Sequence, residues 1–253
     1  MSNTLFIGFS GKIGSGKNYI AEQIFAPLLI KKLYNKNTLI VPYYFSFGDH
    51  LKVECLCRNS YESISDDIGY YDFFCEKNKE TRSMLQKYGT ENGRGKYHEN
   101  IWIRAVDTWI KIQTQRLKKS GINTLAIIII SDIRFKNEVK YIEDHGGIVI
   151  RIDANDRSSL RVDQESNGDV IIKHNIQNHA SEISLDDYEF KYVINNSLNR
   201  ELIEIDNDVN NIINDIYDVI TGEEKNKQLY TDIAEEFDHY VDLYTLRKSD
   251  DKY

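Results

Sequence analysis

The apolar positions in the first part of the chain predict strands that alternate with helices. Residues 4–10 form a short apolar run, and after a group of glycines the apolar residues recur at helical spacing over 20–29. Residues 39–47 predict a second strand, and residues 51–57 predict a short helix that follows it. The chain therefore begins with the order strand, glycine loop, helix and strand.

The next part of the chain predicts two helices. One is expected over 80–88 and the other over 101–117, where apolar residues recur every three or four positions. Trp102 and Trp109 lie at that spacing, so we expect both in the hydrophobic core rather than in a ligand site. The acidic and aromatic stretch 59–79 that precedes these helices shows no clear period.

The second half of the chain continues the alternation. A continuous β-branched run over 125–130 predicts a central parallel strand, buried on both faces, that stops at Asp132. The further elements expected are a helix over 135–145, strands over 148–152 and 192–194, and a helix over 202–219. Because parallel neighbours need crossover connections, this order specifies helices on both faces of a sheet. The predicted fold class is α/β, with three layers around a mostly parallel five-stranded sheet.

The composition is that of a folded acidic protein. Hydrophobic residues make up 41% of the 253 residues and charged residues 28%. The net charge of -8 lacks the basic footprint of a duplex-binding protein, so we expect no stable nucleic-acid binding. Cys55, Cys57 and Cys75 are too few for a disulfide framework, and no apolar run is long enough to span a membrane. We therefore expect a cytoplasmic protein without a membrane partner, and the sequence leaves a homodimer open.

Residues 11–17 carry the clearest chemical signal. They read GKIGSGK, which matches GxxxxGK, and they lie between the first predicted strand and the helix that follows. Glycines let backbone N–H groups surround a phosphate, the helix N-terminus adds partial positive charge, and Lys17 reaches the β- and γ-phosphates. A glycine-rich turn without a ligand is the alternative. The residues expected to bind ATP are Gly11, Lys12, Ile13, Gly14, Ser15, Gly16, Lys17 and Asn18.

The metal expected beside this loop lacks its usual ligand. Asn18 replaces the Ser or Thr whose hydroxyl normally binds magnesium. Because triphosphate transfer needs charge neutralisation, we still expect Mg²⁺ with ATP, held through the Asn18 amide oxygen or a metal-bound water. Asp132, at the end of the buried strand, could hold the metal's water or the substrate, or could simply cap the next helix.

Two further groups of cationic residues could bind phosphate. Arg134 follows Asp132 closely, so its side chain should emerge at the same sheet edge and could meet a phosphate with its bidentate fork. The stretch RSMLQKYGTENGR over 82–94 could grip an acceptor or could be an ordinary solvated surface, and spacing alone leaves both open. The candidates in this stretch are Arg82, Gln86, Thr90, Glu91 and Arg94.

The polar segment 153–182 predicts a mobile lid. It has no apolar period, and Arg157 and Arg161 lie near its start. His179 and Glu182, at its end, could form a polar latch, but a plain helix start is the favoured interpretation.

Taken in order, these motifs resemble those of the phage and viral deoxynucleoside monophosphate kinases. The resemblance is carried by residues 11–17, FGDHLK at 47–52, RxxxQxxGTExxR at 82–94, ISDIRFKNE at 130–138 and HASE at 179–182. It implies a nucleotide-kinase fold, ATP as donor, a deoxynucleoside monophosphate as acceptor, and small nucleotides as partners. It also implies acceptor-side roles for Lys52, Arg82, Gln86, Thr90 and Arg134. From the motifs and the transfer chemistry that they indicate, the catalytic residues expected are Lys17, Asp132, Arg134, Arg157 and Arg161.

The predicted kinase domain spans residues 1–221, with 59–100 as the acceptor-binding region and 153–182 as the lid. Residues 222–253 form a charged C-terminal extension, in which 230–246 could be a helix. Animal phosphomevalonate kinases share a comparable Asp-Arg segment, so the acceptor could be another phosphomonoester. A nucleotide-binding switch without an acceptor is a further alternative, although two separate sets of arginines argue against it. A viral origin would place the protein in the host cytoplasm.

Overall fold

A five-stranded sheet, in which all paired neighbours are parallel, forms the centre of the structure. The computed structural model describes residues 4–58 and 79–221. In the order β2-β3-β1-β4-β5, the strands are β1 Thr4–Ser10, β2 Leu39–Phe45, β3 Thr124–Ile133, β4 Ile148–Asp153 and β5 Tyr192–Asn195. The helix predicted over 230–246 and most of the stretch 59–79 lie outside the described residues.

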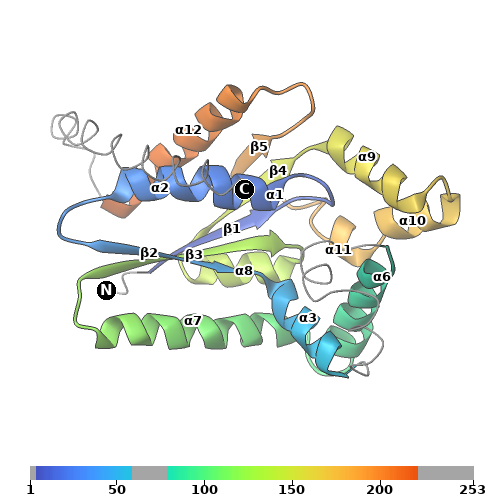
Figure 1. Ribbon diagram of the computed structural model, residues 1–253, viewed down its shortest axis with the longest axis horizontal. Coiled ribbons are helices and arrows are strands. Elements are labelled where there is room, and N and C mark those ends of the chain that lie inside the picture. Colours follow the sequence, from blue (N-terminus) through green and yellow to red (C-terminus); the bar gives the residue numbers. More distant parts are fainter. Residues whose placement is uncertain (1–3, 59–78, 222–253) are drawn as a thin grey trace, which may run out of the picture.

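Helices cover both faces of the sheet, with α2 and α12 on one side and α7 and α8 on the other (Figure 1). The glycine loop leads into one helical segment made of α1 Lys17–Tyr19, the π-helix η1 Ile20–Phe25 and α2 Ala26–Leu33. The other helices are α3 Phe47–Arg58, α6 Lys79–Lys87, the π-helix η2 Tyr88–Gly95, α7 Ile101–Lys119, α8 Lys136–Asp144, α9 Asn155–Ser166, α10 Val170–Gln177, α11 Ala180–Ile183 and α12 Leu202–Thr221. The predicted three-layer α/β fold is confirmed.

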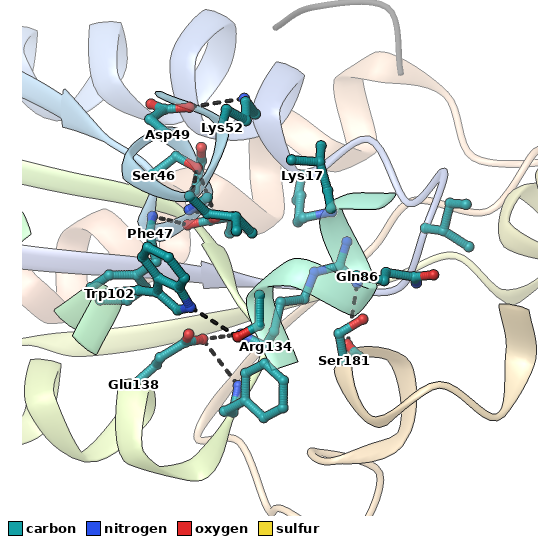
Figure 2. A pocket seen from close by; sticks show the side chains of 18 of the residues that line it. Lys17, Ser46, Phe47, Asp49, Lys52, Gln86, Trp102, Arg134, Glu138 and Ser181 are labelled. Carbon is teal, nitrogen blue, oxygen red and sulfur yellow. Dashed lines mark hydrogen bonds and ion pairs between the residues drawn. The ribbon is translucent and has the colours of Figure 1, made fainter. Parts of the chain in front are cut away.

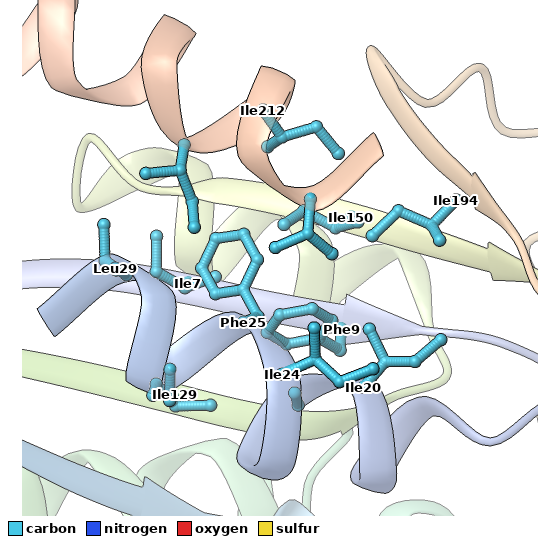
Figure 3. Close-up of a cluster of buried hydrophobic side chains, with 14 of the residues drawn as sticks. Ile7, Phe9, Ile20, Ile24, Phe25, Leu29, Ile129, Ile150, Ile194 and Ile212 are labelled. Carbon is cyan, nitrogen blue, oxygen red and sulfur yellow. The ribbon is translucent and has the colours of Figure 1, made fainter. Parts of the chain in front are cut away.

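The alternation of side chains along the strands divides the apolar residues between two cores. Ile7 and Phe9 belong to the core between the sheet and the layer of α2 and α12, whereas Phe6 belongs to the core beneath α7 and α8. Figure 3 shows the first core, where the rings of Phe9 and Phe25 meet edge to face with centroids 5.2 Å apart. Because helices cover both faces, the central strand β3 is buried along most of its length.

Two expectations about local structure are wrong. Helix α3 begins at Phe47 rather than at residue 51, because a side chain from β3 caps it, as described below. The segment 153–182, expected to be aperiodic, contains α9, α10 and the start of α11. Asp169 caps α10 by accepting hydrogen bonds from the backbone N–H groups of Ile171 and Ile172. α9 contains few apolar residues, and α10 and α11 are too short for their apolar residues to establish a clear period.

The two tryptophans of α7 have different environments. Trp102 is buried with 4% of its surface exposed, as predicted, but Trp109 is 44% exposed, so the expectation that both lie in the core is wrong for Trp109. Its ring stacks on His50 of α3, with ring centroids 6.5 Å apart. Helix α7 packs against both β3 and α3, and Trp109 lies on the α3 side.

The carboxyl ends of the parallel strands meet at one edge of the sheet. Figure 1 shows α3, α6, α9, α10 and α11 gathered near that edge, where the strand arrows end. In open α/β sheets, ligands bind beyond the carboxyl ends of the strands. Among the helices within 4–58 and 79–221, none combines the length and apolar character needed to cross a bilayer.

Candidate active site

The glycine loop between β1 and α1 has the backbone shape that its sequence predicts. Gly14 and Gly16 have φ angles of 72° and 79°, in the left-handed region that favours glycine. A Cβ atom at Gly16 would lie 2.5 Å from Nδ2 of Asn196, so space also requires glycine there. Lys17, which is largely buried, opens α1 directly after the loop. This is the arrangement that a phosphate cradle at a helix start requires.

Asn196, just beyond β5, supports the loop from the side. Its buried Nδ2 donates a hydrogen bond to the carbonyl of Ser15 at 2.8 Å. The carbonyl of Asn196 in turn accepts a hydrogen bond from Nε of Arg157 at 2.6 Å. Arg157, expected to close over a phosphate, is therefore tied to the end of β5.

Asp132, at the end of β3, caps a helix that is distant in sequence. Its Oδ1 accepts the backbone N–H of Phe47 at 2.8 Å, and its Oδ2 accepts the backbone N–H of Gly48 at 2.8 Å. The hydroxyl of Ser46 donates to the same Oδ2 at 2.7 Å. The carboxylate thus satisfies the first N–H groups of α3, a helix earlier in the chain than the one that the sequence pointed to.

Arg134 forms an ion pair with Glu182 of α11. The Arg134 Nη1 lies 2.6 Å from Oε1 of Glu182, and the other carboxylate oxygen accepts the backbone N–H of Ile13 at 2.8 Å. His179 caps α11, because its Nδ1 accepts the backbone N–H of Ser181 at 3.2 Å. His179 therefore marks a helix start, as favoured, whereas Glu182 forms the polar latch that was the disfavoured alternative.

Arg94 belongs to a second buried ion pair, with Glu138 of α8. Its Nη2 lies 2.5 Å from Oε1 of Glu138, and its guanidinium stacks over the ring of Phe135 at 4.1 Å from the centroid. The other oxygen of Glu138 accepts the backbone N–H groups of Arg134 and Phe135. Burial raises the pKa of Glu138 to about 7, against the opposing effect of Arg94. Arg94 thus joins η2 to the segment that carries Arg134.

One cavity of about 1120 Å³ connects the glycine loop with the predicted acceptor side. The loop and α1 contribute Ile13, Gly14, Lys17 and Asn18 to its lining. The other predicted residues that line it are Lys52, Gln86, Thr90, Arg94, Asp132, Arg134 and Arg161. Figure 2 shows Lys17, Gln86 and Arg134 in the same part of this cavity, although they come from three separate parts of the chain.

Two residues of the acceptor wall are held by neighbours on their own helices. Lys52 is buried, and its Nζ lies 2.9 Å from Oδ1 of Asp49. The hydroxyl of Thr90 donates to the carbonyl of Gln86 at 2.6 Å. Lys52 thus reaches the cavity as one half of an ion pair with Asp49, which also lines it, and the Thr90 contact uses only the backbone carbonyl of Gln86.

The remaining predicted residues are placed differently. Arg161 lies over the loop, because a Cβ atom at Gly14 would be 2.7 Å from the Cβ of Arg161. Lys12 pairs with Asp186 at 2.9 Å, and Glu91 is exposed. The predicted residues that are not among the described residues lining the cavity are Gly11, Lys12, Ser15, Gly16, Glu91 and Arg157. Arg82 belongs to α6, and its side chain lies outside the described part of the structure.

The polar residues beside the loop fit a magnesium ion that arrives with a nucleotide. In the described parts of the chain, no group of three or more His, Cys, Asp or Glu side chains could hold a metal. Mg²⁺ usually keeps several waters and binds through one or two carboxylates together with substrate phosphates. Asn18 and Asp132 both line the cavity, but the Asp132 oxygens already accept three hydrogen bonds. Asp132 therefore fits a metal-bound water better than direct coordination, and Asn18 fits either mode.

Three residues that shape this site are not among the site residues predicted from the sequence. Asn196 follows a predicted strand, so the argument that placed Asp132 at the carboxyl edge of the sheet would have found it. Glu138 lies in the segment that resembles the kinases, but its buried pairing with Arg94 is a tertiary contact without a local signal. For Glu182 the sequence alone favours a plain helix start, and its partners, Arg134 and Ile13, lie too far away in the chain to give a local signal.

Comparisons with known proteins agree with the motifs. The chain matches no protein-family profile. A similar curated protein from Acanthamoeba polyphaga mimivirus, described as "Putative deoxynucleotide monophosphate kinase", is 29% identical over 167 residues, which cover 59% of this chain and 74% of that protein. It supports the resemblance to the viral deoxynucleoside monophosphate kinases.

The solved structures that are similar to this one in backbone course include two bacterial kinases. The dephospho-CoA kinase from Campylobacter jejuni is 15% identical, with a TM-score of 0.39 over 85% of this chain and 98% of that chain. The shikimate kinase from Bacteroides thetaiotaomicron is 11% identical, with a TM-score of 0.38 over 84% of this chain and 98% of that chain. These scores are too low to argue for a shared function. The relationship that the comparisons confirm is the resemblance to the viral deoxynucleoside monophosphate kinases.

Proposed function

We propose that this chain is an ATP-dependent kinase that transfers the γ-phosphate of ATP to a deoxynucleoside 5′-monophosphate. The observation that carries the proposal is a single cavity, lined on one side by the glycine loop and on the other by residues of α3, α6 and η2. Single ligand pockets usually measure about 300–1,000 Å³. The cavity of about 1120 Å³ lies just above this range, and its lining reaches from the glycine loop to α3, α6 and η2, which is compatible with a donor and an acceptor side by side. The name of the mimivirus relative supports a deoxynucleotide as the acceptor.

The donor side consists of the glycine loop and Lys17. Backbone N–H groups of the loop would bind the phosphates of ATP, and Lys17 would stabilise the γ-phosphoryl group during transfer. Arg161, which lies over Gly14 and lines the cavity, is placed to approach the same group. Magnesium, when bound with ATP near Asn18 and Asp132, would supply charge neutralisation at the phosphate oxygens.

The acceptor side provides separate cationic groups. Arg134 and Lys52 both line the cavity and would bind the phosphate of the acceptor. An oxygen of that phosphate forms a bond to the γ-phosphorus of ATP, while the bond from the γ-phosphorus to the bridging oxygen breaks and ADP leaves. The attacking phosphate is already anionic near neutral pH, so the reaction requires positioning and charge stabilisation rather than a strong general base.

Two alternative functions differ from the proposed one in the acceptor: one uses another phosphomonoester, and the other uses none. A kinase of another phosphomonoester, such as phosphomevalonate, would use the same phosphate contacts but would not need a site for a base. A nucleotide-binding switch would need only the loop. The presence of Lys52, Arg94 and Arg134 around the same cavity favours a kinase, because a switch requires no second phosphate site.

A coupled assay of ADP release tests the proposal. The protein is given ATP and magnesium together with one candidate acceptor at a time: dTMP, dGMP, dCMP, dAMP, the ribonucleotides or phosphomevalonate. We expect ADP production that depends on at least one deoxynucleotide, with the corresponding diphosphate as product. ADP production with phosphomevalonate alone would support a kinase of another phosphomonoester. ADP production that no acceptor increases would indicate a switch or an ATPase.

A further inference from the structure

Glu182 joins the glycine loop to the candidate acceptor arginine. Its side chain is only 4% exposed, and both of its carboxylate oxygens have partners. One oxygen binds the Arg134 guanidinium at 2.6 Å, and the other accepts the Ile13 N–H at 2.8 Å. A single carboxylate therefore sets the separation between an arginine beyond β3 and a backbone group of the loop.

The position of Glu182 is itself fixed by short-range contacts. The backbone N–H of Glu182 donates to the carbonyl of His179 at 2.8 Å, within the turn that His179 caps. Ile13 is also held through its side chain, which packs with Val162 of α9 and Ile176 of α10. The Glu182 carboxylate thus lies between the turn that begins α11 and the loop residue Ile13. A buried carboxylate of this kind needs its partners because desolvation disfavours the charged form.

The other charged groups near this latch do not replace Arg134. Arg151 of β4 donates from Nη1 to the hydroxyl of Ser10 at 3.1 Å and lies 3.9 Å from Asp186. Burial lowers the pKa of His179, which keeps this imidazole neutral near pH 7. Among the contacts of the described residues, neither the Arg151 side chain nor the His179 side chain has a hydrogen bond or salt bridge to the Glu182 carboxylate.

Arg134 keeps part of its guanidinium for another partner. Among the contacts of the described residues, Arg134 donates through Nη1 to Glu182, with the carbonyl of Ser181 at 3.5 Å from the same atom. The guanidinium is a rigid planar fork, so fixing one nitrogen also fixes the direction of Nε and Nη2. Because Arg134 lines the cavity, those donors remain for an oxyanion there.

We propose that Glu182 is a positioning residue, which holds the Arg134 guanidinium at a set distance from the glycine loop so that the acceptor phosphate meets the donor in line. This inference rests on the proposed kinase function. It assigns to Glu182 an effect on turnover that is exerted through Arg134 and not through contact with either substrate.

The first test is the substitution Glu182→Gln, which keeps the side-chain size and removes the charge. We expect kcat/KM for the acceptor to fall by about 10- to 100-fold, the scale on which a 1 Å misplacement acts. The Kd of ATP, measured by calorimetry, should change little. The matched control is Asp187→Asn, which removes a pair with Lys136 that is 2.6 Å long but exposed, with side chains 57% and 70% accessible. This control should retain full activity.

The second test is a double-mutant cycle with Arg134→Ala. Because Glu182 acts through Arg134, Glu182→Gln should lower kcat/KM little further once Arg134 is absent. An equal loss in both backgrounds would overturn the proposal. Tighter ATP binding by Glu182→Gln at unchanged kcat would also overturn it, because the carboxylate would then be a competitor for the loop.

The same cycle measured by urea unfolding separates this inference from the proposed function. The losses of stability caused by Glu182→Gln and Arg134→Ala should be clearly non-additive, since the residues are in contact. Additive losses would show that the latch is not formed and would overturn the inference even in an active kinase. If the unchanged chain phosphorylates no acceptor, the proposed function fails, and with it the positioning role, whereas non-additive unfolding would leave the Glu182–Arg134 contact established.

Discussion

Asp132 caps the helix that Phe47 begins, although 85 positions separate the two residues in the chain. The Phe47 N–H donates to Oδ1 of Asp132 at 2.8 Å, and this contact places the start of α3 against the carboxyl end of β3. Lys52 lies on α3 and lines the cavity. The cap therefore sets the position of one wall of the proposed acceptor site relative to the central strand.

The substitution Asp132→Ala should destabilise the protein. It leaves the first N–H groups of α3 without their acceptor, and the combined loss of a cap and of hydrogen bonds should cost about 2–3 kcal/mol. The free energy of unfolding in urea measures the effect. The control Asp144→Asn removes an exposed pair with Lys140 and should change stability by less than about 0.5 kcal/mol. A loss of activity without a loss of stability would instead indicate that Asp132 acts mainly on the metal or substrate.

The buried pair between Arg94 and Glu138 predicts a larger effect. Arg94→Ala leaves a carboxylate that is 2% exposed without its partner, and breaking such a pair typically costs about 3–5 kcal/mol. Urea unfolding again provides the measurement. The exposed pair of Lys111 and Asp107 supplies a control, since Lys111→Ala should cost no more than about 1 kcal/mol. Similar losses for the two variants would show that the Arg94 pair is not buried in solution.

The raised pKa of Glu138 predicts a pH dependence of stability. The carboxyl has a pKa of about 7 in the folded protein and an ordinary value of 4.5, so the folded state binds the proton more tightly between these pH values. The stabilisation from Glu138 is therefore complete below pH 4.5 and is lost as pH rises toward about 7. The stability of the unchanged protein, relative to Glu138→Gln, should fall by at most about 1.4 kcal/mol per pH unit in this window. A constant difference across the window would contradict the shift.

Local sequence signals predicted the framework of the site. The order of apolar runs gave the parallel sheet, and the glycines of residues 11–17 gave the loop, because strand periodicity and positive φ angles are local properties. The carboxyl-edge argument correctly brought Arg134 to the cavity that Lys17 lines. These predictions needed no knowledge of which side chains meet.

The contacts of the site depended on tertiary structure and could not be predicted in this way. Asp132 was expected to serve a metal, a substrate or the next helix, but its partner is a helix much earlier in the chain. Glu138 and Glu182 have their arginine partners 44 and 48 positions away. Pairing over such separations leaves no periodic signal, so a charged residue in a pocket and one on a surface look alike in the sequence.

Lys17 should be required for catalysis. We expect Lys17→Ala to lower turnover by at least about 10³-fold, as loss of a preorganised electrostatic donor does. Rates of ADP release and the circular dichroism spectrum should be measured together, because Lys17 is largely buried. Lys140→Ala, on an exposed side chain, is the control. Retained turnover in a folded Lys17→Ala protein would show that the loop is not the donor site.

The segment 153–182 is attached to the loop by few apolar contacts. Ile13, Val162 and Ile176 form a small cluster apart from the two main cores. Segments with few buried contacts open at a lower free energy than the cores. The helices found in this segment are therefore compatible with the predicted lid, and its motion remains a prediction.

Hydrogen exchange can measure this motion. Amides of α9 and α10 should exchange faster than those of β3 in the free protein, and their exchange should slow strongly when both substrate sites are filled by a bisubstrate analogue. ATP alone should slow the exchange less, because only a second anionic ligand adds further partners for Arg161. Each charge-assisted hydrogen bond to that ligand would contribute roughly 1.5–3 kcal/mol and so offset part of the entropic cost of ordering the segment. Arg161→Ala should lower turnover more than ATP affinity, whereas Arg157→Ala should have a smaller effect, since Arg157 is bound to the Asn196 carbonyl. If exchange in α9 and α10 is already as slow as in β3, the segment is a fixed wall of the cavity, and Arg161 would then act without closure.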